Sequence, residues 1–236
     1  QLLKSGLGLL FLPILGGLSD YIGRRFLLRF CLLAALLQII FLAPPSITAF
    51  SANQFTTMLF ISRSIGGISA AYTPLLFASL TDLANGDSLA LPVFYGKVGL
   101  IFGAAFTFGP GTASLIFATL GVNAVVMVSA ISASAALMTF AIFVRVDSLP
   151  SHKRRRIPQQ WFKNAPFLLS LTPFEQIRLL SKNPLVAAYI GVYFVREVAD
   201  GVFMTWILYV EWRYNFSVAL VGIFLSSIGI VVGLFQ

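Results

Sequence analysis

The chain has 236 residues, of which 58% are hydrophobic and 10% are charged, and its formal net charge is +8. So few polar residues cannot coat a water-soluble globule of this length, and the composition therefore predicts an integral membrane protein. The apolar stretches are long and unbroken, which favours transmembrane helices over a β-barrel. The single cysteine, Cys31, lies in an apolar run, which excludes a disulfide framework and predicts a small buried side chain.

Apolar stretches predict transmembrane helices along most of the chain. In chain order they cover approximately residues 2–18, 26–43, 55–80, 93–120, 122–144, 185–210 and 218–235. The second is predicted to end at the turn Pro44-Pro45-Ser46, and the third at a polar loop over residues 81–87. The fourth contains Gly109-Pro110-Gly111, which predicts a break or a bend because proline removes a backbone donor.

Residues 146–184 differ in character and predict a long linker. They contain the basic run at 153–156 and several prolines. A capping box that begins at Thr172 predicts a short amphipathic helix on the membrane surface. The linker separates two predicted domains, a bundle over residues 1–145 and the start of a second bundle over residues 185–236. The first residue is not methionine and the last lies in an apolar run, so we expect a fragment of a longer protein.

The distribution of lysine and arginine predicts the orientation. Most of them lie in the loop at residues 20–29 and in the linker at 145–182, and four predicted spans separate these two segments, which places both on one side. The positive-inside rule makes that side cytoplasmic. The net charge then follows from topology and from contact with anionic lipid, and it requires no nucleic-acid partner. Which membrane holds the protein is not indicated.

Three motifs follow one another at informative intervals. The first is a glycine-rich charged turn between the first two spans, made of Gly16, Asp20, Gly23, Arg24 and Arg25. The second runs from Leu59 to Arg63 and from Gly67 to Ala70. The third comprises Gly96, Ala105, Gly109, Pro110, Ala113 and Ser114.

Together these motifs resemble the major facilitator superfamily, and within it the drug/proton antiporter branch that includes tetracycline efflux proteins. Asp147-Ser148-Leu149-Pro150 is similar to a run that follows helix six in that family. The resemblance implies an all-α membrane fold of two bundles that alternate access, with this chain covering helices two to eight of twelve. It also implies that the first motif is a gating latch whose charge pairs form in one access state. Asp20 is predicted to face the start of the next helix, where the helix dipole and the two arginines favour an anion. The other interpretation of these residues is ordinary cytoplasmic loop charge.

Arg63 is predicted to lie about eight residues into its span, roughly 12 Å along the helix and therefore within the hydrocarbon. A charge there should face a cavity or an acidic partner. The resemblance implies a base that helps couple proton movement to transport. The alternative is an arginine that reaches back to the extracellular interface. The Gly109-Pro110 pair likewise has two interpretations, a gating element and an ordinary packing kink.

A second charged group, Arg196, Glu197 and Asp200, lies near the middle of the span at 185–210. The spacing of three and four residues allows one helix face to hold the group. We expect Glu197, with Asp200 second, to exchange a proton or to contact a cationic substrate. The alternative is an internal pair between Arg196 and Asp200.

The sequence offers no enzyme chemistry. The one histidine, His152, lies in the linker, so a histidine-based metal site or triad is not available, and no phosphate-binding loop is present that would drive ATP-dependent pumping. We expect no cofactor, a proton gradient as the energy source, and a monomer that contacts lipid, protons and a small organic solute. A facilitator or symporter of the same fold is the alternative within transport, and a transport-inactive scaffold or receptor is the alternative outside it.

Overall fold

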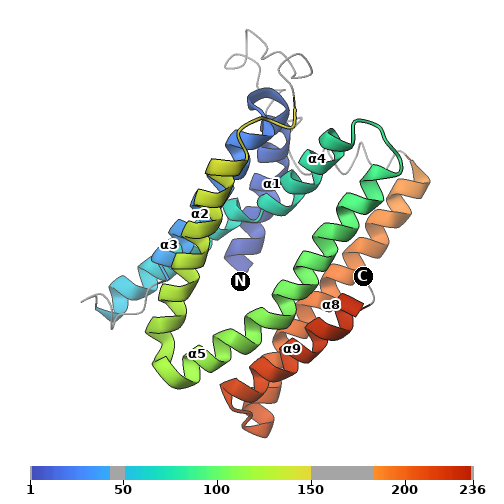
Figure 1. Ribbon diagram of the computed structural model, residues 1–236. Helices are drawn as coiled ribbons and strands as arrows, with labels where there is room; N and C mark the ends of the chain where they lie inside the picture. Colours follow the sequence, from blue (N-terminus) through green and yellow to red (C-terminus); the bar gives the residue numbers. More distant parts are fainter. Residues whose placement is uncertain (1, 43–50, 150–182, 235–236) are drawn as a thin grey trace. The chain divides into compact units, whose positions relative to one another are not determined.

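The computed structural model describes residues 2–42, 51–149 and 183–234, and its regular structure in these ranges is helical. The predicted turn at Pro44, the basic run at 153–156 and the predicted amphipathic helix after Thr172 lie outside the described residues. The helices shown in Figure 1 are α1 (Leu2–Ile22), α2 (Arg24–Ile40), α3 (Ala52–Ser69), α4 (Tyr72–Ala84), α5 (Ala90–Phe143), α8 (Pro184–Tyr214) and α9 (Val218–Leu234).

The predicted span at 55–80 is divided into two helices, α3 and α4. Ala70 and Ala71 form the turn between them. Pro74, in the first turn of α4, has no backbone N–H to donate to the carbonyl of Ala70, and its ring crowds that carbonyl, which explains the interruption. The helix α4 continues to Ala84, where Asn85 ends it in the left-handed conformation with φ 47°. Thr81 and Asp82, predicted in a loop, therefore belong to the last turn of a helix.

The predicted spans at 93–120 and 122–144 are joined within α5. The backbone between them leaves the helical region at Gly121, with φ 81° and ψ 179°. This conformation is essentially restricted to glycine, so Gly121 separates the two halves. The helix is continuous through Gly109-Pro110-Gly111, so of the predicted break or bend the break does not occur. A helix tolerates a proline at this depth when neighbouring groups accommodate the carbonyl that loses its donor.

The described helices fall into two compact units. One unit comprises Gln1–Tyr95 and Asn123–Glu175, and the other comprises Gly96–Val122 and Gln176–Gln236. In the first unit α3 packs against α1 and α2, and in the second α8 packs against α9 (Figure 1). Because the division follows spatial contacts, the first half of α5 groups with α8 and α9. The predicted division by chain order, at residues 145 and 185, stays a prediction.

The first unit has a small buried core built from α1, α2 and α4. Its buried members are Leu15, Leu27, Leu28, Cys31, Ala71 and Leu75. Cys31 is fully buried, with its Sγ 3.7 Å from the carbonyl oxygen of Ile68, which confirms the prediction of a small buried side chain.

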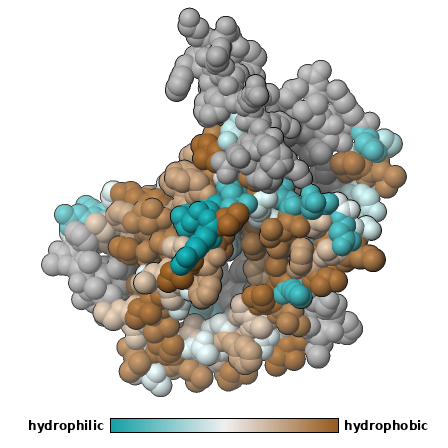
Figure 2. Space-filling model, turned by 45° about the horizontal axis from the view of Figure 1, so that its top comes forward, coloured by the Kyte–Doolittle hydropathy of each residue, from teal (hydrophilic) through white to brown (hydrophobic). Residues whose placement is uncertain are grey.

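Hydrophobic side chains also cover most of the described surface. Figure 2 shows them over most of one face, with hydrophilic residues in a few small groups. Phe143 is 79% exposed and Leu100 67% exposed, which would be unfavourable in water and is ordinary against lipid. Among the described helices, α5 is long and apolar enough to cross a membrane, while Gly6–Ile22 and Val218–Val231 are apolar but shorter.

Candidate functional site

Charged residues at one end of the first unit form a network around Arg24. The guanidinium lies 2.7 Å from Asp20 and 3.1 Å from Asp82, and it also donates to the hydroxyl of Ser19. Only 13% of the Arg24 side chain is exposed, against 30% for Asp20 and 20% for Asp82. Since Asp20, Arg24 and Asp82 belong to α1, α2 and α4, one side chain joins the ends of three helices.

The local sequence explains why the network forms. Asp20 lies in the last turn of α1 and Arg24 is the first residue of α2, with Gly23 between the two helices. Gly23 has φ 109°, which glycine adopts without steric cost, so the chain turns sharply enough for the two charges to meet. Asp82 reaches the same place because α4 extends one turn beyond its predicted end.

Asp147 and Arg29 link α2 to the end of α5. The carboxylate of Asp147 accepts the backbone N–H of Arg24 at 3.1 Å, and that of Leu149 at 3.2 Å. It thereby places a negative charge at the positive end of α2. Arg29 donates to the carbonyl oxygens of Ala141 and Val144, at 3.1 and 3.5 Å, where the last turn of α5 is negative. At the start of α2 Asp147 thus accepts a backbone N–H, while Asp20, which was predicted to face this helix start, pairs with the Arg24 side chain.

The other members of the first motif make fewer contacts. Arg25 has no ion pair in the described part of the chain, and its Nε is buried without an acceptor. The carbonyl of Gly16 accepts the Ser19 hydroxyl at 2.5 Å, and the space where a side chain at Gly16 would lie is open. The geometry therefore concentrates the motif's charge contacts on Arg24. The gating role of the motif stays a prediction.

Arg63 lies deep in α3 and has a second cation as its neighbour. It is the twelfth residue of α3, roughly 17 Å along the helix from the first. The Lys4 side chain of α1 is close enough for electrostatic repulsion between the two. The helices approach closely here, because a Cβ on Gly67 would lie 2.7 Å from the Cβ of Leu7 and 3.2 Å from the Lys4 carbonyl oxygen. Within the described ranges neither cation has an acidic partner, although the sequence predicted one, or a cavity, for Arg63.

The third motif lies where the first half of α5 packs against α9. A Cβ on Gly222 would lie 2.8 Å from the Pro110 carbonyl oxygen, and one on Gly229 would lie 2.6 Å from the Thr107 backbone nitrogen. A Cβ on Gly111 would meet the Ser226 hydroxyl at 2.7 Å. Small residues on both helices thus permit close backbone contact, as in other membrane helix pairs. By contrast, the space beside Gly109 is open.

Arg196, Glu197 and Asp200 lie in α8 as predicted. Their side chains are outside the described residues, so the two interpretations of the cluster remain as the sequence left them.

The structure brings four residues to these sites that sequence reasoning had not assigned to them. They are Ser19, Asp82, Asp147 and Lys4. Asp147 carried a signal, since it begins the run resembling a family feature. Asp82 was hidden by a loop prediction four residues too early, and Lys4 by its position near the start of a span.

Comparison with known proteins gives consistent results. A sequence profile described as the Major Facilitator Superfamily matches residues 5–236. The chain is 25% identical over 240 residues to the class H tetracycline resistance protein of Pasteurella multocida. The alignment covers 99% of this chain and 54% of that protein. It is 28% identical over 166 residues to human major facilitator superfamily domain-containing protein 10, covering 70% of this chain and 33% of that protein.

A solved structure shares the fold. The crystal structure of the human organic anion transporter MFSD10 (TETRAN) aligns with a TM-score of 0.64 at 21% identity, over 99% of this chain and 53% of that chain. The chain spans about half the length of the tetracycline resistance proteins that it matches.

Proposed function

Because the chain belongs to the major facilitator superfamily, whose members are integral multi-pass membrane transporters and not enzymes, we propose that it moves a small organic solute across a membrane by alternating access. The observation that carries this proposal is the Arg24 network, in which one part-buried guanidinium holds carboxylates from two other helices. Such a contact has two discrete arrangements, made and broken, as a switch between two access states requires.

The network acts as a latch at the predicted cytoplasmic end. While Arg24 holds Asp20 and Asp82, the ends of α1, α2 and α4 stay together. Asp147 adds a further link through the backbone of α2. Loss of these contacts in the other access state would bias the equilibrium by their net free energy, about 2 kcal/mol for two partly exposed charge pairs. That corresponds to roughly a 30-fold change in the populations of the two states.

Proton exchange drives export in this proposal. Support comes from the tetracycline resistance proteins, which the chain resembles over nearly its whole length. The sequence of α8 places two acids, Glu197 and Asp200, near the middle of a membrane helix, where unpaired carboxylates are costly and commonly mark proton pathways. Glu197 takes up and releases the proton, with Asp200 second, and Arg63 assists the coupling. The protein acts as a monomer without a cofactor, and its linker faces the cytoplasm.

Transport by the full-length protein in proteoliposomes tests the proposal. With tetracycline as the probe, an imposed proton gradient should drive uptake into inverted vesicles and produce a matching proton efflux. Glu197→Gln and Asp200→Asn should slow uptake and shift its pH dependence. Glu211→Gln is the control, because Glu211 is exposed near the end of the same helix.

Full rates with unchanged pH dependence in Glu197→Gln and Asp200→Asn would contradict the coupling. Downhill transport without proton movement would indicate a facilitator. An absence of transport and of proton flux for every solute tested would indicate a scaffold or receptor.

The Lys4 and Arg63 pair favours a second candidate, a carrier of organic anions. Two neighbouring cations within a membrane bundle need a negative partner, and the described residues supply none. An anionic solute would satisfy both cations, and one relative with a solved structure is described as an organic anion transporter. Uptake of carboxyfluorescein should then fall in Lys4→Gln and Arg63→Gln while uptake of a neutral solute is retained. Equal loss for both solutes would point to an acid elsewhere in the full-length protein as the partner.

A further inference from the structure

A pocket lies beside the Arg24 network, within the first unit, between α2, α4 and the end of α5. Its volume is about 220 Å³. This is smaller than the roughly 300–1,000 Å³ of pockets that enclose a drug-sized molecule, so a transported solute does not fit it well. The latch described above uses Arg24 and Asp147 from its wall and leaves the pocket itself unexplained.

Two hydrogen-bond donors on the pocket wall lack partners. The Nε of Arg25 and the hydroxyl of Ser148 are both buried without a hydrogen bond. A buried guanidinium N–H without an acceptor is unfavourable, which indicates that an acceptor is supplied by something else. A phosphate is a suitable partner for donors of this kind, because it is an anion with several strong acceptor oxygens.

The other charges on the pocket wall are already engaged. Arg24 pairs with Asp20 and Asp82, which lie outside the wall. Asp147, the one acid on the wall among the described residues, accepts two backbone N–H groups. Arg25 is therefore the cation whose charge remains available to a ligand.

The rest of the wall is apolar except for Ser79, whose hydroxyl donates to the carbonyl of Leu75, and two of the apolar residues are open to the surroundings. Its apolar members are Leu28, Leu76, Leu80, Leu83, Phe140, Val144 and Val146. Leu83 is 60% exposed and Val146 is 82% exposed, so apolar groups lie at the mouth of the pocket as well as inside it. A free phosphate ion would leave these surfaces uncovered, whereas a phospholipid would cover them with its glycerol and upper acyl methylenes.

We propose that this pocket binds an anionic phospholipid, with the phosphate at Arg25 and Ser148 and the acyl chains along Leu83 and Val146. On the predicted orientation the pocket opens toward the cytoplasmic leaflet, where anionic lipids are concentrated. The bound lipid contacts α2, α4 and the end of α5 next to the latch, so its occupancy stabilises the arrangement in which Arg24 is paired.

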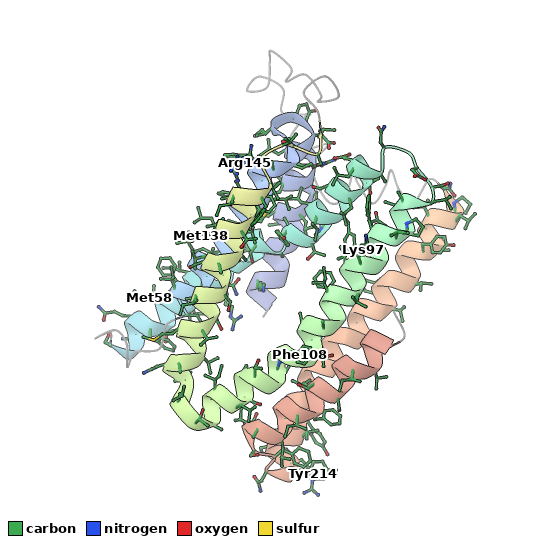
Figure 3. All side chains as sticks on the ribbon, viewed as in Figure 1. Met58, Lys97, Phe108, Met138, Arg145 and Tyr214 are labelled. Atoms are coloured by element: carbon green, nitrogen blue, oxygen red, sulfur yellow. The ribbon has the colours of Figure 1, made fainter. Side chains whose placement is uncertain are left out.

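Native mass spectrometry of the full-length protein tests the site, with phosphatidylglycerol and phosphatidylcholine titrated separately. Phosphatidylglycerol should bind more tightly, and Arg25→Gln should weaken it about tenfold, as expected for the loss of one charge-assisted hydrogen bond. Arg25→Lys should bind with intermediate affinity and Ser148→Ala with a smaller loss. Arg145→Gln is the matched control, because Arg145, which lies just after α5 (Figure 3), is exposed and does not line the pocket.

Four results would overturn the proposal. One is equal affinity for the two lipids. Another is equal weakening by Arg145→Gln and Arg25→Gln, which would indicate general charge attraction. The third comes from a photo-crosslinking amino acid at Leu83, which should capture lipid. Capture of the chain's own residues 150–182 instead would identify the pocket as an internal contact. The fourth result is competition by inorganic phosphate alone, which would indicate that the ligand is a free ion.

Discussion

Loss of the Arg24 charge is predicted to lower the free energy of unfolding measurably. In Arg24→Gln, Asp20 and Asp82 each lose a charged partner, at 2.7 and 3.1 Å in the native protein. A hydrogen bond to a charged group contributes about 1.5–3 kcal/mol when buried. Exposures of 30% and 20% for the two carboxylates reduce this by solvent screening to about 1 kcal/mol for each pair. The expected loss is therefore about 2 kcal/mol.

A double-mutant cycle isolates one of the pairs. Arg24→Gln, Asp82→Asn and the double variant are unfolded reversibly in mixed micelles, in the background of the full-length protein. We expect a coupling energy of about 1 kcal/mol between the two positions, because each single substitution breaks the same contact. Arg145 donates only to the nearby carbonyl of Ile142 among the described contacts, so Arg145→Gln should change stability by less than about 0.5 kcal/mol. Additivity of the Arg24 and Asp82 substitutions to within about 0.3 kcal/mol would refute the assigned pair.

Four other substitutions test the remaining geometry. Gly229→Ala should destabilise the packing of α5 on α9 by about 1–3 kcal/mol, because its Cβ would lie 2.6 Å from the Thr107 nitrogen. Gly96→Ala is the control, because the space beside Gly96 is open, and it should leave the unfolding temperature unchanged or raise it. A loss of stability equal to that of Gly229→Ala would contradict the close contact at Gly229. Gly121→Ala should cost about 1–3 kcal/mol, since φ 81° with ψ 179° excludes other residues, and an unchanged unfolding temperature would argue against that backbone. Asp147→Asn should cost about 0.5–2 kcal/mol through the lost charge at the start of α2, with faster amide exchange in that helix, and unchanged exchange would contradict the role.

The sequence was sufficient for the fold class and for most helix positions, because long apolar runs leave few alternatives in a membrane. It was insufficient where one residue decides between continuing and ending a helix. Pro74 separates α3 from α4, whereas Pro110 is accommodated within α5. A local pattern cannot distinguish these two prolines, since the outcome depends on how neighbouring groups accommodate the carbonyl that loses its donor.

The candidate site was predictable in part. The motif around Arg24 was recognisable, but its partners Asp82 and Asp147 are 58 and 123 residues away in the chain. Only the folded arrangement shows that both meet Arg24, and that Arg25 beside it has no acidic partner among the described residues. The nearness of Lys4 to Arg63 likewise arises from the close crossing of α1 and α3 at Gly67.

The most direct test of the central claim measures solute and proton movement together. Full-length protein, with the native sequence or with Arg24→Gln, is reconstituted into proteoliposomes that contain a pH-sensitive dye. Tetracycline is then added outside the vesicles. We predict solute uptake coupled to proton efflux in the native protein, and a marked slowing of both in the variant, because the latch no longer biases the access states. Native uptake without proton movement, or an Arg24→Gln variant that transports at the native rate, would contradict the account.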